Sequence, residues 1–583
     1  MRELSRVCDD RPRVEEANHN LPAFSRVFKE TILVSDLSRP LPRAGKGTIQ
    51  RKKALELYAH DIEQLYKTVE ESSSAHGVAP PPSWDVKDVQ SWLAEHAAGI
   101  NDERVVDPDR DLFEQGFDSL SATFLRNRII GTLRESSDDA INTTARHVPQ
   151  NFIFQHPTLS SLAEAVAALV RSDDSVVQSP SEEIEATIEK YTALLPARAP
   201  EVATVGDGER VVLLTGTTGN LGAHVLALLL SEERTKRVYA LNRGSGLMHR
   251  QRAAFDAAQL PLELLDHPKL TLLSVDYTRD DLGLSQDNAN EVVTHIVHSA
   301  WRVDFNLALT SFGTQIASAI RLLALAPAAH YLFTSSVSAA SGWNVKKDNH
   351  GAHVPEAALH DSSIAAATSG YGMSKYVVEE VLASAHQRGL KTTSLRIGQI
   401  SGSSKGGVWN ASEWVPNIVK SSLALGALPD AESVVSWVPM DAVARVVVDV
   451  VLGREAPELI NVVHPRPVEW SAVFGAMQAE LSLEYLRVAS GEDRTFTSVM
   501  SAPYVLIPSC QPGIKLLDYY RTVIHAEAQA KRDGVDGCEA GGLPFFETSK
   551  ACSVSKTLAE LPPLGAQDAR AWVIYWKSIG FLP

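Results

Sequence analysis

The sequence predicts a multidomain protein in which a small helical bundle precedes a doubly wound α/β domain with a parallel sheet. Two polar stretches without hydrophobic periodicity, residues 71–83 and 171–183, divide the 583 residues into three segments. Apolar residues recur at helical spacing in the middle segment, and short apolar strands alternate with helical segments in the last one. We therefore expect domains at residues 1–72, 84–172 and 205–583.

The composition argues for a compact protein that binds neither nucleic acid nor membrane. Hydrophobic residues make up 44% and charged residues 22% of the chain, and the net charge is −16, so the basic footprint of a nucleic-acid binder is absent. No signal peptide is recognisable, and no apolar run reaches the roughly 18 residues of a membrane helix. The four cysteines, Cys8, Cys510, Cys538 and Cys552, have no metal-binding spacing. We expect a cytoplasmic location and no metal site.

Helical periodicity in the middle segment predicts helices over residues 84–97 and 118–133, and a third that opens at Pro157. Asp118 and Ser119 lie at the start of the second helix, where short polar side chains cap free backbone N–H groups. Taken alone, Ser119 is adequately explained as such a cap.

The surrounding residues give Ser119 a second interpretation. The turn Gly116-Phe-Asp-Ser-Leu120 and the stretch Phe154-Gln-His-Pro-Thr-Leu-Ser-Ser-Leu-Ala163 resemble an acyl or peptidyl carrier domain. The resemblance implies a four-helix bundle whose Ser119 receives 4′-phosphopantetheine from a phosphopantetheinyl transferase. A swinging arm on an exposed helix start raises the local concentration of a tethered substrate at distant sites.

The head of the chain carries a glycine-rich loop, Leu41-Pro-Arg-Ala-Gly-Lys-Gly-Thr-Ile-Gln-Arg51. It can be a basic surface loop. It also resembles the C-terminal end of an adenylate-forming domain, where a lysine matching Lys46 reaches the acyl phosphate. The part of such domains that binds ATP and the acid is missing from this sequence. Either a truncated gene product or an incomplete gene model would explain this. We therefore expect no adenylation by these residues, and an adenylation domain in trans is one candidate partner.

The last segment contains six short apolar runs separated by helical stretches, which indicates parallel βαβ units. The predicted strands are residues 211–215, 237–241, 271–275, 295–298, 331–335 and 392–397.

The first of these strands runs into the glycines Gly216, Gly219 and Gly222. Such glycines allow a tight turn, close approach of backbone to a pyrophosphate, and close packing of helix on strand. A tight turn needed only for packing is the alternative, but the position after the first strand of an alternating series favours a dinucleotide site. We expect the cofactor to be bound by Gly216, Thr218, Gly219, Asn220, Leu221 and Gly222.

The end of the second strand carries Asn242 and Arg243 in place of the acidic residue usual for NAD. An arginine can form a charge-assisted pair with a 2′-phosphate, so we predict NADPH over NADH. Asp276, after the third strand, is a candidate acceptor for the adenine amino group. A surface charge at Arg243 and a turn cap at Asp276 are the alternatives.

Tyr371 and Lys375 form an i,i+4 pair on one helix face. A neighbouring ammonium is expected to lower the pKa of Tyr371 and to make it a proton donor to a developing alkoxide. With the glycine turn and the strand end Phe333-Thr-Ser-Ser336, the pair resembles the Ser/Thr–Tyr–Lys triad of extended short-chain dehydrogenases/reductases. We align Ser336 with the triad hydroxyl and keep Ser335 as a rival.

Two further stretches, His298-Ser-Ala-Trp-Arg-Val-Asp-Phe-Asn306 and Leu395-Arg-Ile-Gly-Gln-Ile-Ser-Gly402, are similar to the thioester reductase domains of carboxylic acid reductases and aminoadipate reductases. This similarity implies a C-terminal substrate subdomain and NADPH-dependent release of a carrier-bound acyl thioester as an aldehyde, or as an alcohol after a second reduction. Arg302 and Asn306 would lie on the substrate side, and His298 is expected to pack at its strand end.

Three alternatives stay open: a nucleotide-sugar epimerase or dehydrogenase, a redox-inactive release domain, and a non-catalytic carrier remnant. The attached carrier segment argues against the first, and the retained Ser, Tyr and Lys argue against the second. The acid that is reduced is not identified by the sequence.

Overall fold

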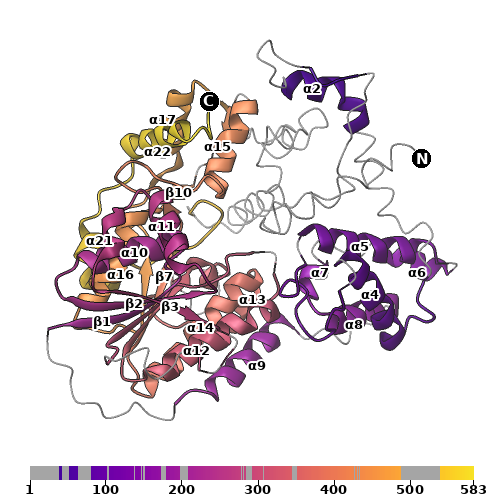
Figure 1. The fold of residues 1–583 in the computed structure, drawn as a ribbon, viewed down its shortest axis with the longest axis horizontal. Helices are drawn as coiled ribbons and strands as arrows, with labels where there is room; N and C mark the ends of the chain where they lie inside the picture. The colour runs from indigo at the N-terminus through magenta and orange to yellow at the C-terminus, as the bar shows by residue number, and fades with distance from the viewer. Residues whose placement is uncertain are drawn as a thin grey trace. The chain divides into compact units, whose positions relative to one another are not determined.

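The computed structural model of the chain has two compact units, Met1–Gln178 with Asn306–Ser311, and Ser179–Phe305 with Phe312–Pro583 (Figure 1). The structure describes residues 39–42, 51–62, 80–171, 179–196, 208–486 and 539–583, apart from 102–103, 118, 137, 146–147, 149–151, 278, 280, 284–291, 306, 345–350, 426, 430 and 432.

The first unit is helical. Its elements are α2 (Arg51–Leu57), α4 (Val86–Ile100), α5 (Ser119–Arg134), α6 (Asp139–Thr144), α7 (Phe152–Gln155) and α8 (Leu159–Arg171). In α8 the buried side chains Leu159, Leu162, Ala163 and Val166 follow helical spacing, and they form one core with apolar residues of α4 and α5. The three predicted helices are therefore present, and α6 and α7 are added to them.

The second unit is built on a seven-stranded sheet in the order β12-β7-β5-β4-β1-β2-β3, with every pairing parallel. The strands are β1 (Arg210–Thr215), β2 (Thr235–Arg243), β3 (Leu270–Val275), β4 (His295–His298), β5 (His330–Ser336), β7 (Thr392–Ile397) and β12 (Leu459–Val462). All six predicted strands are confirmed. The order reverses between β1 and β4, which is where doubly wound sheets bind nucleotides, beyond the carboxyl ends of the strands.

Helices cover both faces of this sheet (Figure 1). On one face, α10 (Asn220–Ser231), α11 (Leu247–Ala257) and α16 (Met440–Leu452) share a core with β1 and β12. On the other face, α14 (Gly370–Gln387) packs on β5 and β7 and contacts α12 (Gly313–Leu325). Burial from both sides explains why the strands read as continuous apolar runs.

Helix α9 (Pro180–Thr192) overlaps the end of the predicted linker, residues 171–183, and precedes the predicted start of the last domain at residue 205. Ser179 caps α9 in a reciprocal capping box with Glu182, and the hydroxyl of Tyr191 donates to the carbonyl of Gly313 over 3.0 Å. α9 packs against α14, so the second unit begins at Ser179. The Ser- and Glu-rich start of the helix resembles a linker because only its inner face is apolar.

A second core lies toward the C-terminus of this unit, where α15 (Trp414–Leu425), α17 (Trp470–Leu481) and α22 (Ala566–Ser578) pack together. Its centre is aromatic: Trp409, Trp437, Trp572 and Trp576 are buried in mutual contact. The remaining elements are short: η5 (Leu262–Asp266), η7 (Leu309–Phe312), η8 (Val337–Ala340), β6 (His353–Val354), α13 (Ser362–Ala366), β8 (Ile400–Ser401), β9 (Ala427–Pro429), β10 (Val434–Val435), β11 (Val438–Pro439), β13 (Val468–Glu469), β14 (Glu484–Leu486), β15 (Phe545–Phe546), α20 (Ser549–Val554) and α21 (Lys556–Glu560).

Two negative findings hold for the described residues. Among their helices, none combines the length and apolarity that crossing a bilayer requires. Within the same residues, no group of three or more His, Cys, Asp or Glu side chains is arranged to hold a metal ion.

Candidate active site

The glycine turn between β1 and α10 has a geometry that excludes larger residues. Gly216 has φ of 75°, and a Cβ there would lie 2.9 Å from the backbone nitrogen of Ala300. A Cβ on Gly222 would lie 2.1 Å from the carbonyl oxygen of Gly216, so the helix can lie on the turn only without one. α10 begins at Asn220 with Gly219 as its N-cap and no side-chain cap bond. This bare helix N-terminus fits the pyrophosphate of a dinucleotide.

The side chains around the turn divide into two groups. Asn242, buried at the end of β2, donates to the hydroxyl of Thr217 over 2.6 Å, and Thr218 donates to Asn242 over 3.4 Å. The Asn242 side chain therefore holds the glycine turn in place through Thr217 and Thr218. Leu221 packs against the apolar core, so its contribution to a ligand site is through its backbone.

Arg243 and Asp276 are exposed residues at the carboxyl ends of neighbouring strands, β2 and β3. The charge of Arg243 acts on Tyr277, where burial nevertheless raises the pKa of Tyr277 to about 12. The end of β2 thus presents a guanidinium and an amide, without an acidic group that would repel a 2′-phosphate.

The close approach of α14 to η8 brings Tyr371 to the end of β5. Gly372 makes this approach, because a Cβ there would lie 2.6 Å from the carbonyl oxygen of Ser338. The hydroxyls of Tyr371 and Ser336 share a hydrogen bond, and Ser336 also accepts from the amide of Ser338 over 3.2 Å. Ser336 and Tyr371, which are far apart in the sequence, therefore meet at the carboxyl edge of the sheet.

The two candidate serines point to different partners. Ser335 is buried and donates to the carboxylate of Glu379, whereas Ser336 bonds with Tyr371. Both partners lie on α14, but Tyr371 and Glu379 are eight residues apart there, so each serine meets a different one. The structure favours Ser336 in the triad.

Lys375 lies beneath this pair and is almost completely buried. Its ammonium donates to the carbonyl of Thr334 over 2.7 Å and lies 4.3 Å from the centre of the Trp301 ring and 4.5 Å from that of Phe333. Burial lowers the pKa of Lys375 well below its ordinary value, and the charge of Glu379 opposes this effect. Carbonyl and ring faces stabilise the cation without neutralising it.

The expected lowering of the tyrosine pKa was wrong. Burial raises the pKa of Tyr371 to about 12, and the hydrogen bond with Ser336 offsets this only in part. The ammonium of Lys375 is 5.6 Å from the centre of the Tyr371 ring and is directed to the Thr334 carbonyl. Tyr371 is thus a protonated phenol at neutral pH, which is the form that can donate a proton.

The β4–α12 loop supplies the other neighbours of Tyr371. The Phe305 ring contacts the Tyr371 ring edge-on at 5.0 Å between centroids. His298 packs at the end of β4 as expected: its Nδ1 is 3.0 Å from the Thr215 hydroxyl, and burial lowers its pKa to about 3. Arg302 forms an ion pair with Asp304 at 3.3 Å, and Asn306 lies outside the described residues.

In the first unit, α5 begins at Ser119 as predicted, after a turn in which Gly116 has φ of 109°. The side chain of Ser119 lies outside the described residues, as does Lys46 in the head.

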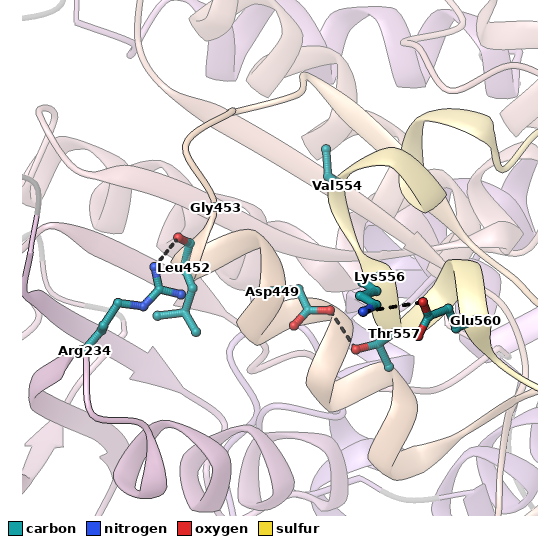
Figure 2. A pocket seen from close by; sticks show the side chains of 8 residues that line it. All are labelled: Arg234, Asp449, Leu452, Gly453, Val554, Lys556, Thr557 and Glu560. Atoms are coloured by element: carbon teal, nitrogen blue, oxygen red, sulfur yellow. Dashed lines mark hydrogen bonds and ion pairs between the residues drawn. The ribbon is translucent and has the colours of Figure 1, made fainter.

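Figure 2 shows a hollow of about 500 Å³ between the start of β2 and the ends of α16 and α21. Its charged groups all have partners within its lining: Arg234 donates to the Leu452 carbonyl, Asp449 accepts from Thr557, and Lys556 pairs with Glu560. It lies at the edge where the parallel strands begin, opposite the edge that carries Tyr371. It is therefore separate from the candidate active site.

Comparison with known proteins gives two family matches. Residues 214–447 match the NAD-binding domain described as male sterility protein, and residues 4–70 match the C-terminal domain of AMP-binding enzymes.

Similar proteins extend the match to nearly the whole chain. Adenylate-forming reductase Nps11 of Serpula lacrymans is 42% identical over 98% of this chain and 54% of that protein. The carboxylic acid reductase of Neurospora crassa is 27% identical over 97% of this chain and 54% of that protein. The chain thus spans about half the length of the curated relatives it matches.

Solved structures support the fold. The terminal R domain from the myxalamid PKS-NRPS pathway aligns with a TM-score of 0.53 at 22% identity, covering 69% of this chain and 98% of that one. A thiolation-reductase di-domain from an archaeal non-ribosomal peptide synthetase aligns with a TM-score of 0.51 at 17% identity, covering 87% of this chain and 99% of that one.

Proposed function

Because the chain is a relative of the adenylate-forming reductases, matched over 98% of its own length, we propose that it reduces a carrier-bound acyl thioester with NADPH, which breaks the C–S bond and releases an aldehyde and the free thiol of the carrier arm. The observation that carries this proposal is the meeting of Ser336, Tyr371 and Lys375 at the carboxyl edge of the sheet, beside the glycine turn. A release of alcohol would need a second reduction at the same site.

Each residue of the site has its own role in the proposed reduction. NADPH, when bound at the glycine turn, supplies the hydride. Tyr371 donates its phenolic proton to the substrate carbonyl oxygen as negative charge develops there. Ser336 orients the phenol through their hydrogen bond. The buried ammonium of Lys375 favours negative charge in its neighbourhood, because electrostatic interactions are strong where water is excluded.

The preference for NADPH over NADH rests on Arg243 at the end of β2. Its guanidinium is exposed and can form a bidentate, charge-assisted pair with a 2′-phosphate. Asp276, at the end of the next strand, is the proposed acceptor for the adenine amino group.

The first unit is proposed to be the carrier, with Ser119 as the attachment site of 4′-phosphopantetheine. This proposal is supported by the position of Ser119 at the start of α5, directly after the left-handed turn at Gly116. A phosphopantetheinyl transferase is the partner it requires. The match of residues 4–70 to an AMP-binding C-terminal domain supports the assignment of the head, and an adenylation domain would load the acid.

The experiment that tests the proposed function offers the full chain NADPH and a series of synthetic acyl-pantetheine thioesters. We expect NADPH oxidation that depends on the thioester, with an aldehyde as the product by mass. Stoichiometric NADPH binding without turnover of any thioester would support a non-catalytic carrier remnant instead.

A further inference from the structure

A buried carboxylate lies one helical turn beyond Lys375. Tyr371, Lys375 and Glu379 follow one another at intervals of four residues on α14, and residues at this spacing share one helix face. Glu379 is 2% exposed, the same as Lys375. A buried carboxylate is costly unless it is paired and hydrogen-bonded, so its partners indicate what it does.

Both oxygens of Glu379 are held by neighbouring strands. Arg396 on β7 donates from Nε to Oε1 over 3.2 Å and from Nη2 to Oε2 over 2.5 Å, and both side chains of this ion pair are buried. Ser335 at the end of β5 donates to Oε1 as well. The carboxylate is therefore fixed from two strands, one helical turn beyond Lys375.

Arg396 is fixed in turn by the C-terminal part of the chain. Its Nη1 donates to the carbonyl of Pro355 over 3.3 Å and to Oδ1 of Asn461 on β12 over 3.4 Å. The backbone N–H of Asn461 donates to the carboxylate of Glu356. The same carboxylate also accepts from the backbone N–H of Ala551 on α20. This buried chain of polar groups connects α14 to α20, near the C-terminus of the chain.

The groups around Lys375 come from β4, β5, β7 and α14 and from the loop after β4. β5 supplies the Thr334 carbonyl and the Phe333 ring, the loop supplies the Trp301 ring, and all three are uncharged. His298 of β4 is neutral, since burial lowers its pKa to about 3. On α14 itself, Tyr371 is a neutral phenol, and Glu379 is the acidic group whose charge raises the pKa of Lys375 against burial. The cation of β7, Arg396, is paired with Glu379.

From this geometry we propose that Glu379, fixed by Arg396 and Ser335, is a positioning residue that keeps Lys375 charged inside the triad. The proposal rests on the proposed reduction at Tyr371 and extends the site to a residue that does not touch the substrate. A buried lysine without a nearby anion is readily neutralised, because burial disfavours the charged form. A neutral Lys375 no longer favours the negative charge that forms on the substrate oxygen.

The test is the pH dependence of turnover by Glu379→Gln. Lys375 acts as a cation, so activity falls as pH rises through its pKa. Tyr371, with a pKa of about 12, does not set this fall below pH 10. Removing the carboxylate lowers the pKa of Lys375, and we expect the alkaline limb of kcat to move about 1 pH unit or more to lower pH. Glu379→Asp keeps the charge and should restore the limb even where it lowers stability.

Glu380→Gln is the matched control on the same helix. Glu380 is also buried, but it accepts from the amides of Leu359 and His360 and from the His360 ring, away from Lys375. We expect this variant to lose stability without any movement of the alkaline limb. An equal movement in Glu379→Gln and Glu380→Gln, or none in Glu379→Gln, would overturn the proposal.

A second readout does not depend on turnover. Between the lowered pKa of folded Lys375 and its ordinary value near 10.5, unfolding takes up a proton, so stability rises with pH across that window. Glu379→Gln extends the window to lower pH, and its melting temperature should rise more between pH 7 and pH 9 than that of the wild type. If the wild-type protein turns over no thioester, the proposed function is refuted. If Glu379→Gln has the same melting profile as the wild type, the proposed role of Glu379 is refuted.

Removing Glu379 alone leaves Arg396 buried without its partner, which is strongly destabilising. If Glu379→Gln does not fold, the double variant Glu379→Gln/Arg396→Gln removes both charges together. It should show the same movement of the alkaline limb and of the melting profile, because Glu379 is the group that acts on Lys375. A double variant with wild-type profiles would refute the proposal.

Discussion

The substitution Tyr371→Phe removes one hydroxyl from a residue that is only 8% exposed and leaves its ring in place. The ring contacts Phe305 and Phe312 do not involve the hydroxyl, so the packing should persist. The lost hydrogen bond with Ser336 costs about 1 kcal/mol of folding stability, because Ser336 still accepts from the amide of Ser338. If the hydroxyl is the proton donor, turnover should fall by about 10²- to 10⁴-fold while NADPH binding survives.

The assay is NADPH oxidation with a synthetic acyl-pantetheine thioester, followed together with the melting temperature of the same sample. Tyr376→Phe is the control: Tyr376 is a buried tyrosine on the same helix, and its hydroxyl bonds to the backbone of Asp361. Both variants should lose similar stability, but only Tyr371→Phe should lose turnover. Near wild-type turnover by folded Tyr371→Phe would refute the assigned proton donor.

Three further substitutions test other parts of the site. Arg243→Ala should weaken NADPH binding about 10- to 100-fold by titration and leave NADH binding unchanged. Arg252→Ala, which replaces another exposed arginine, should affect neither cofactor. Equal weakening of both cofactors would show that Arg243 does not bind the 2′-phosphate. Ser119→Ala should abolish the single mass addition made by a phosphopantetheinyl transferase and coenzyme A, and an addition that persists contradicts the carrier assignment. Gly222→Ala places a Cβ 2.1 Å from a backbone oxygen and should abolish cofactor binding, whereas Gly208→Ala meets nothing within 4 Å; a Gly222→Ala protein that binds NADPH normally would show that the turn tolerates a side chain.

Much of the second unit could be predicted because its signals are local. Five of the six predicted strands are mostly buried runs, while the edge strand β3 is half-buried, and the glycine turn follows the first of them directly. Tyr371 and Lys375 are four residues apart in one helix, so their common face follows from helix geometry alone. β12 (Leu459–Val462) was not among the predicted strands, although it is as long as β4.

The tertiary structure decided what depends on distant partners. The assignment of Ser336 over Ser335 follows from which hydroxyl bonds with Tyr371 and which donates to Glu379. The pKa of Tyr371 is raised and not lowered as the sequence predicted, because burial by several elements outweighs the effect of Lys375, the one neighbour visible in the sequence. α9 joined the second unit through contacts with residues more than one hundred positions away.

The pairing of Glu379 with Arg396 depends partly on local sequence and partly on the tertiary structure. The spacing of Glu379 from Lys375 was readable in the sequence, and Arg396 lies within the stretch from Leu395 to Gly402. Nothing local shows that the two side chains meet in the core, because β7 reaches α14 only once the sheet has formed. The sequence by itself determined the order of the elements and indicated the candidate reactive side chains. Their charge states were decided by the folded protein, since burial and pairing sum over residues that only the fold brings together.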